Sequence, residues 1–262
     1  MPSRLQKRIA ESGLMSRRAA EEAIRAGRVT VNGRPAVLGE RCEETDTVLV
    51  DGRPIPAAEE KQVYMLNKPR GYVCSLHDEK GRKSVRALLP ASAGRLYPVG
   101  RLDIMSEGLL LMTNDGDLTL RLTHPSGQVF KTYRTTVRPD NVADGESERT
   151  EMGLTGGLTG DRNAELEERI ARLHRPFVLN DIEVCAKAVE VVTRDRDNAV
   201  LDITVGEGRN RQIRRMCEMA GLTVLRLVRT AEGPLQLGSL PTGSARRLTD
   251  AEIACLMKEA KE

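Results

Sequence analysis

The sequence predicts an α+β fold in two units. A small N-terminal module of two helices and short strands is followed by a larger domain, built on a mixed, mainly antiparallel sheet flanked by helices. Strand-like and helix-like segments alternate after residue 62 without an internal repeat, and residues 54–61 (PIPAAEEK) have linker composition. The 262 residues are 39% hydrophobic and 30% charged, which is typical of a folded chain. We place the domain boundary near residue 60, between 1–60 and 61–262.

The N-terminal module is expected to begin with two short helices. Leu5 and Ile9 lie one helical turn apart, and Gly13 can end that helix. Ser16 can cap a second helix, which Gly27 can end. Strand-like residues 29–31 and 47–50 follow, and the Asn32-Gly33 dipeptide after the first favours a tight hairpin turn. The module is therefore expected to place a helix pair beside a small sheet.

The larger domain is expected to combine a sheet with several helices. Apolar runs predict strands at 63–66, 72–75, 108–112, 128–137, 182–192, 200–205 and 222–228. Helical spacing predicts helices at 85–89, 117–122, 209–220 and 250–259, the last with a capping box of Thr249 and Glu252, and the second capped by Asp117. Residues 140–178 show weak periodicity and predict an exposed loop with one charged helix at 165–173.

Several classes of protein are excluded by the sequence. No apolar run approaches the roughly 20 residues of a membrane span, and the N-terminus resembles no export signal, so we expect a cytoplasmic protein. The five cysteines are scattered without a Cys-x-x-Cys pair, and there are three histidines. Neither a disulfide framework nor a zinc site is indicated, and no metal is expected.

Positive charge is concentrated in two segments although the net charge is only +3. Residues 1–34 hold eight basic and three acidic side chains, and residues 207–229 hold six arginines and two glutamates. Two separate positive surfaces indicate binding of a polyanion, with a solvated charged face as the alternative for each. Aromatic residues are only 2% of the chain, so a stacking platform for several bases is not expected.

Asp103 is the first candidate for chemistry. It lies in the turn-rich stretch between two apolar strands, VGRLDIMSEGLLL (99–111), with Arg101 and Ser106 close in sequence. A loop aspartate most often caps its own turn. The alternative is a carboxylate held in a cleft for catalysis.

The arginine-rich segment 209–216 is the second candidate. On a helix, one packed stripe would be formed by Ile213, Met216, Cys217 and Ala220. Arg211 and Arg215 would point away from that stripe, as suits phosphate binding, while Arg214 at its edge could reach a partly buried carboxylate. A helix with a solvated arginine face is the alternative. On the strand at 128–137, Lys131 and Tyr133 share one face, although most strand tyrosines only pack.

Three motifs together resemble a known enzyme family. They are NKPRGY (67–72), GRLDIMSEGLLLMTNDG (100–116) and EGRNRQIRRM (207–216). They resemble pseudouridine synthases that act on ribosomal RNA, in the RsuA/RluB-like branch, and the N-terminal module resembles the S4-like RNA-binding domain of that branch. The likeness covers about residues 1–137 and 180–250.

The resemblance implies catalytic roles for three residues: Asp103 as nucleophile, Tyr133 as site tyrosine and Arg214 as basic partner of the aspartate. It also implies that Arg101 contacts RNA and that Lys68 supports the site or binds a phosphate. Further RNA contacts are expected from basic residues of both positive segments, namely Arg4, Lys7, Arg17, Arg18, Arg25, Arg28, Arg209, Arg211 and Arg215.

The implied reaction isomerises uridine in a ribosomal RNA or ribosomal subunit precursor, with the target nucleotide flipped out and no cofactor. The turn after Asn67 and residues 81–84 (GRKS) favour a large-subunit (23S) target, and a small-subunit (16S) target is the alternative. A non-catalytic RNA-binding or ribosome-assembly factor is the alternative of a different class. The resemblance also implies a monomer.

Overall fold

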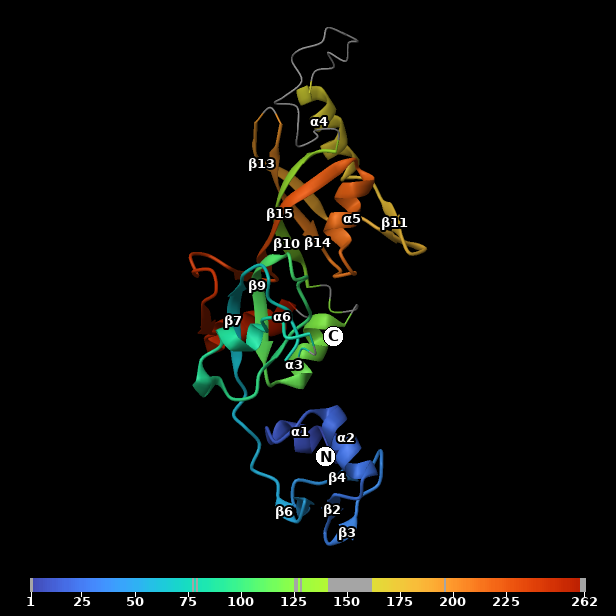
Figure 1. Ribbon diagram of the computed structural model, residues 1–262, viewed down its shortest axis with the longest axis vertical. Coiled ribbons are helices and arrows are strands. Elements are labelled where there is room, and N and C mark those ends of the chain that lie inside the picture. The colour runs from blue at the N-terminus through green and yellow to red at the C-terminus, as the bar shows by residue number, and fades with distance from the viewer. Residues whose placement is uncertain are drawn as a thin grey trace.

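The structure, a computed structural model, describes residues 2–259 except 77, 79, 125, 126, 128, 141–161 and 196. The chain forms a small N-terminal unit at one end and a larger unit built around a long sheet, joined by residues 55–62 (Figure 1). Helices and both parallel and antiparallel strand pairs occur in the larger unit, which confirms the α+β prediction.

The N-terminal unit packs two helices against short strands. Its elements are β1 (Ser3–Arg4), α1 (Leu5–Glu11), α2 (Arg17–Arg25), β2 (Val29–Val31), β3 (Arg34–Pro35), β4 (Arg41–Cys42), β5 (Val48–Val50) and β6 (Arg53–Pro54). The Ser16 Oγ accepts a hydrogen bond from the Ala19 amide at 3.0 Å and so caps α2, as predicted. Asn32 and Gly33 both have positive φ, 51° and 81°, as a tight hairpin turn between β2 and β3 requires. A hydrophobic core of this unit's own joins the helices to the sheet.

The larger unit is organised by one nine-stranded sheet. Its main path runs β13-β14-β10-β15-β9-β7-β17, with β16 added to β15 and β8 added to β9. The strands are β7 (Val63–Lys68), β8 (Tyr97–Pro98), β9 (Glu107–Thr113), β10 (Lys131–Pro139), β13 (Ala188–Arg194), β14 (Ala199–Val205), β15 (Leu222–Glu232), β16 (Leu235–Gln236) and β17 (Ala245–Arg247). The β9–β15 pair is parallel, and the other pairs are antiparallel.

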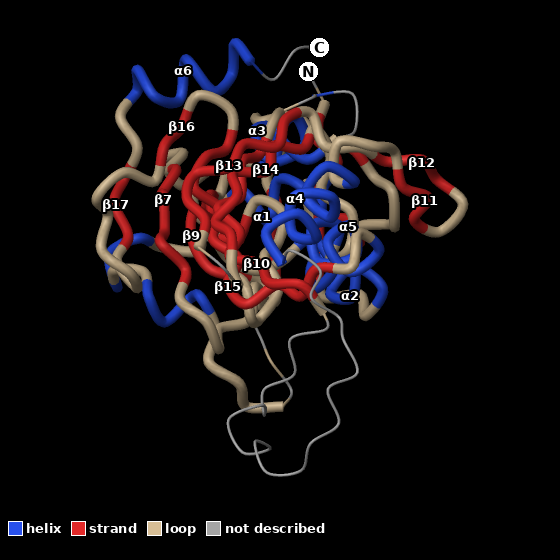
Figure 2. The backbone as a smooth tube through the Cα atoms, turned by 90° about the horizontal axis from the view of Figure 1, so that it is seen from above, coloured by secondary structure: helices blue, strands red, loops and turns tan. Residues whose placement is uncertain are grey.

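Both faces of the sheet are covered where β7 and β9 lie. All seven residues of β9 are buried, and its leucines alternate between two hydrophobic clusters, one on each face. The helices of this unit are α3 (Gly116–Thr123), α4 (Arg162–Arg172), α5 (Gln212–Met219) and α6 (Asp250–Glu259), with 3₁₀ turns at Val85–Leu88 and Ala91–Ala93. Figure 2 shows α6 beside β16, and α5 on the other side of the sheet. The continuous apolar run of β9 is therefore explained by burial on both sides.

Several predicted boundaries are wrong for local reasons. Residues 72–75 form no strand, only a single bridge from Val73 to Ser84. The predicted strand 182–192 is two strands, because residues 182–184 (β12, Ile182–Val184) pair with β11 (Phe177–Leu179), whereas β13 pairs with β14. The cap of α3 is Asp115, whose Oδ1 accepts from the amides of Asp117 and Leu118 at 2.9 and 3.2 Å. Asp117 itself lies inside the first turn.

Two further helix predictions are met. Helix α6 spans the predicted residues, and the capping box forms through the Thr249 amide to Glu252 Oε2 (2.9 Å) and the Glu252 amide to Thr249 Oγ1 (3.2 Å). The charged helix in the segment 140–178 is α4. The predicted loop is wrong at its end, because residues 177 and 178 belong to β11, and residues 141–161 lie outside the described residues.

Candidate active site

The turn that carries Asp103 is held by Lys68, the last residue of β7. The Lys68 side chain is fully buried, and its Nζ donates hydrogen bonds to the backbone oxygens of Pro69 (3.1 Å), Asp103 (3.1 Å) and Ser106 (2.8 Å). Burial lowers the pKa of Lys68, and nearby groups including Asp103 oppose that shift. Of the two predicted roles, support of the site fits this placement. The expected contact with a phosphate finds no support in this placement, because the ammonium is buried and bonded to three backbone oxygens.

A second contact fixes the residue before Asp103. The Cys74 Sγ accepts a hydrogen bond from the Leu102 amide (3.3 Å) and donates one to the Leu102 carbonyl (3.2 Å). Burial raises the pKa of the Cys74 thiol, so it stays protonated and able to donate. Because Lys68 and Cys74 both bond the backbone of this turn, the half-buried Asp103 is presented on a constrained turn.

A cavity of about 700 Å³ lies at this turn, within the size range of ligand pockets. It is lined by parts of five segments, within 73–82, 99–106, 122–133, 205–213 and 227–232. The structure brings five predicted site residues to its wall: Arg101, Asp103, Tyr133, Arg209 and Arg211. Residues far apart in the sequence therefore meet in one concave site.

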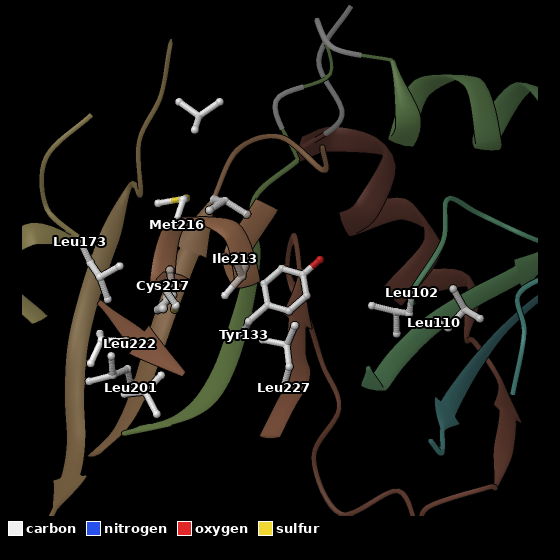
Figure 3. Close-up of a cluster of buried hydrophobic side chains, with 14 of the residues drawn as sticks. Leu102, Leu110, Tyr133, Leu173, Leu201, Ile213, Met216, Cys217, Leu222 and Leu227 are labelled. Atoms are coloured by element: carbon white, nitrogen blue, oxygen red, sulfur yellow. The ribbon is translucent and has the colours of Figure 1, made fainter. Parts of the chain in front are cut away.

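Tyr133 comes from β10, which crosses the centre of the sheet. Lys131 and Tyr133 both line the cavity, as the predicted alternation requires. The Tyr133 side chain also belongs to the main hydrophobic cluster, with its ring beside Ile213 and Leu227 (Figure 3). Burial raises the pKa of Tyr133, and the positive charge of Arg229 opposes that shift. Tyr133 is therefore both a packing residue and part of the cavity wall.

Arg214 lies near the Asp103 turn without pairing with the carboxylate. Its Nη2 donates to the Met105 carbonyl at 3.2 Å and its Nη1 to the Val224 carbonyl at 3.4 Å. Within the described residues no ion pair joins Arg214 to Asp103, because both Nη atoms bond backbone carbonyls instead. Burial and then the charge of Arg211 lower the pKa of Arg214, whereas Asp103 raises it. The guanidinium Nε is buried and has no hydrogen-bond partner.

The loop before α5 differs from the predicted helix. The helix begins at Gln212, and Arg211 precedes it with a left-handed backbone (φ 52°). Arg209 and Arg211 are therefore exposed loop residues at the cavity, not residues of a helix face. The predicted packed stripe of Ile213, Met216, Cys217 and Ala220 is buried, as expected.

The other predicted RNA-binding residues lie away from the cavity. Arg215 donates to Asn180 Oδ1 (3.1 Å) on the β11–β12 hairpin. In the N-terminal unit, Lys7 pairs with Asp117 of α3 (2.9 Å) across the two units, and Arg28 pairs with Asp51. Exposed arginines of this unit include Arg4, Arg17, Arg18 and Arg25, of which Arg17 lies against Gly116 of the larger unit. Lys7 and Arg17 thus stand at a contact within the protein.

Sequence reasoning missed two buried charged residues of the cavity wall, Arg229 and Glu232 on β15. Their spacing of three residues predicts opposite faces on a regular strand, so no sequence signal placed them together. Among the described residues, no cluster of three or more His, Cys, Asp or Glu could hold a metal ion. No described helix has the length and apolar character needed to cross a membrane.

Known proteins are similar to this chain over nearly its whole length. Residues 62–219 match the family described as RNA pseudouridylate synthase, and residues 3–48 match the S4 domain. The "Ribosomal large subunit pseudouridine synthase B" of Bacillus subtilis (strain 168) is 36% identical over 95% of this chain and 93% of its own. The protein of the same name from Vibrio cholerae is 38% identical over 93% of this chain and 70% of its own.

A solved structure agrees with these sequence matches. The structure titled "Crystal structure of pseudouridylate synthase" is 30% identical, with a TM-score of 0.59 over 97% of this chain and 99% of that one. The cavity that gathers Asp103 and Tyr133 lies largely within the matched residues 62–219. The chain belongs to the RNA pseudouridylate synthase family.

Proposed function

We propose that this protein converts a uridine of large-subunit ribosomal RNA to pseudouridine, with Asp103 as the nucleophile. The observation that carries the proposal is the half-buried Asp103 on a turn fixed by Lys68, in a cavity shared with Tyr133. The large-subunit target is supported by the names of the relatives from Bacillus subtilis and Vibrio cholerae.

The reaction needs residue types that this cavity contains. The bond from N1 of uracil to the sugar C1′ breaks, the base turns, and a bond from C5 to C1′ forms. The C5 proton is lost and N1 gains a proton, so no atoms are added overall and the proposal includes no cofactor. Asp103 can attack C1′, attack the uracil ring, or act as a base in a glycal route. Each route requires an ionised carboxylate beside the nucleoside.

Tyr133 and Arg214 have distinct proposed roles around Asp103. Because burial raises the pKa of Tyr133, the side chain is a neutral phenol that can stack on the uracil and take part in the later proton transfer. Arg214 supplies positive charge near the turn, and its unpartnered Nε leaves one donor unsatisfied before substrate binds.

RNA binding is proposed at two places. A uridine stacked in RNA cannot reach a cavity wall, so the nucleotide is flipped out, and the exposed Arg101, Arg209 and Arg211 contact the displaced strand. The N-terminal unit, residues 1–60, is proposed as an RNA-binding domain with its own core, and residues 61–262 as the catalytic domain. We further propose that the protein acts as a monomer on ribosomal RNA or a subunit precursor in the cytoplasm.

Tritium release tests the proposal directly. Uridine labelled at C5 in large-subunit ribosomal RNA transcripts should lose tritium with the wild-type protein and none above background with Asp103→Asn. Asp202→Asn is the matched control, because it changes an aspartate paired with Arg134 on a neighbouring strand outside the cavity. An Asp103→Asn protein that turns over like wild type would reject the mechanism.

The same assay separates the remaining alternatives. Tight binding of ribosomal RNA by the wild-type protein without label release from any precursor would identify a non-catalytic assembly factor. Release from small-subunit transcripts alone would replace the proposed target. Mapping pseudouridines in the ribosomal RNA of a strain that lacks this protein identifies the modified position.

A further inference from the structure

An irregularity in the sheet gathers four polar side chains on one wall of the cavity. Strands β10 and β15 pair with Lys131 opposite Glu232, but Tyr133 lies opposite Arg229, because the register shifts between Thr132 and Tyr133. A bulge of this kind adds one residue to a strand and re-aims its side chains. As a result Arg229 and Glu232, three residues apart, both line the cavity with Lys131 and Tyr133.

Three of these side chains form what we call the buried charge cluster, namely Lys131, Arg229 and Glu232. Arg229 is 2% exposed and Glu232 1%, and the Lys131 side chain is 14% exposed. Glu232 Oε2 lies 3.3 Å from Arg229 Nη2, and Glu232 Oε1 lies 3.8 Å from Lys131 Nζ. One carboxylate is thus shared by two cations.

Both cations, Arg229 and Lys131, also donate hydrogen bonds to backbone carbonyls of the site. Arg229 Nε donates to the Leu109 carbonyl at 2.6 Å, and Lys131 Nζ donates to the Val129 carbonyl at 3.1 Å. The backbone of Arg229 is itself closely packed, since a Cβ on Gly108 of β9 would lie 2.3 Å from the Arg229 carbonyl oxygen. The cluster is therefore built into the rigid centre of the sheet.

Glu232 is the group that balances this cluster. Within the described residues no other carboxylate lies within 4.0 Å of Lys131 or Arg229. Burial lowers the pKa of Lys131, and Glu232 opposes that shift while Arg229 adds to it. Loss of the carboxylate would leave two buried cations facing each other, which is among the most unfavourable changes in a protein interior.

The cluster reaches the proposed chemistry through Tyr133. Arg229 lies directly across the strands from Tyr133, and Lys131 lies two residues along the same face of β10. We propose that Glu232 is a positioning residue for the synthase reaction: it holds Arg229 and Lys131 in the places that keep the Tyr133 side chain aligned in the cavity. This inference rests on the proposed function of the cavity, and Glu232 itself touches no reacting atom.

The test uses Glu232→Gln in the full-length protein, which keeps the shape of the side chain and removes its charge. In single-turnover tritium release we expect the rate to fall about tenfold or more while the dissociation constant for RNA changes less than about threefold. Asp202→Asn removes a carboxylate that pairs with Arg134 on β10, next in sequence to Tyr133, and is expected to keep the wild-type rate. Equal rates for Glu232→Gln and wild type would overturn the proposal.

A spectroscopic readout separates alignment of Tyr133 from general damage. The chain has four tyrosines and no tryptophan, so tyrosinate absorbance is not obscured, and the difference from Tyr133→Phe isolates the Tyr133 titration. Burial raises the pKa of Tyr133, the charges of Glu232 and Asp103 raise it further, and Arg229 lowers it. Glu232→Gln should therefore shift the Tyr133 titration to lower pH, and an unmoved titration would contradict the inference.

Two further outcomes keep the test decisive. If Glu232→Gln does not fold, Glu232→Asp is the second variant, because it keeps the negative charge but moves it away from both cations. A folded Glu232→Asp protein should show a several-fold slower rate with unchanged RNA affinity. A wild-type rate for that variant would reject the positioning role. If the wild-type protein and Asp202→Asn release no tritium at all, the proposed function fails instead.

Discussion

Replacing Lys68 tests whether the Asp103 turn depends on one buried ammonium. Lys68→Met keeps most of the apolar stem and removes the group that bonds three backbone oxygens. The Asp103 oxygen retains a bond from the Ser106 amide at 3.0 Å, so the change chiefly affects the Pro69 and Ser106 carbonyls. The perturbation is thus local to the turn that presents the carboxylate.

The expected magnitude follows from these contacts. The buried Ser106 carbonyl left without a partner costs about 1–3 kcal/mol, and the partly buried Pro69 carbonyl costs less than that because water can reach it. Removing a buried ammonium recovers part of that cost, because the charge no longer has to be desolvated, and we expect a net loss of about 2 kcal/mol in the free energy of unfolding. A displacement of Asp103 by about 1 Å would slow turnover about 100-fold.

Urea unfolding and single-turnover tritium release measure the two effects separately. Arg134→Met is the matched control, since it removes a cation from an exposed pair with Asp202 (2.8 Å) and should cost no more than about 1 kcal/mol. We expect Arg134→Met to keep the wild-type rate. A folded Lys68→Met protein with wild-type turnover would refute the view that Lys68 positions Asp103.

Two other predictions concern stability and RNA binding. Hydrogen bonding to Arg246 lowers the pKa of Glu252 from 4.5 to about 2, so its stabilisation is present above pH 4.5 and is lost as pH falls towards 2. After allowance for solvent screening, Glu252→Gln should cost about 1 kcal/mol at neutral pH in urea unfolding, and a difference that stays constant below pH 4.5 would contradict this origin. Arg18→Glu should weaken RNA binding, and the slope of the logarithm of the binding constant against the logarithm of salt concentration should become shallower by about one. An unchanged slope would mean that the exposed Arg18 contacts no phosphate.

Local periodicity accounts for what the sequence predicted correctly. The shared face of Lys131 and Tyr133 depends only on strand alternation, and the burial of Ile213 and Met216 depends only on helical spacing. Both are properties of a few consecutive residues, so both can be read without knowing the neighbours in space. The capping of α2 by Ser16 is of the same kind.

Pairing between distant segments accounts for what was missed. The split of residues 182–192 into two strands depends on a change of partner from β11 to β14. The meeting of Arg229 and Glu232 in the cavity depends on the register shift between β10 and β15. The left-handed backbone at Arg211, unusual for a residue with a side chain, moved the helix start to Gln212. No local pattern encodes these features.

The number of charges in the positive segment 207–229 could not predict which of its arginines are free to bind RNA. Their contacts and burial in the structure decide this. Its six arginines predicted a positive surface for a polyanion, with Arg214 set apart as the one that could reach a carboxylate. In the structure Arg229 is buried and holds the Leu109 carbonyl, Arg226 pairs with Glu107 at 2.9 Å, and Arg214 bonds two carbonyls. Cations held by such contacts fix the backbone around Asp103 and Tyr133, while Arg209 and Arg211 are exposed at the cavity, where we propose that they contact RNA. Because only contacts with phosphate release counterions, the salt dependence of RNA binding should report the exposed arginines of this segment and not all six.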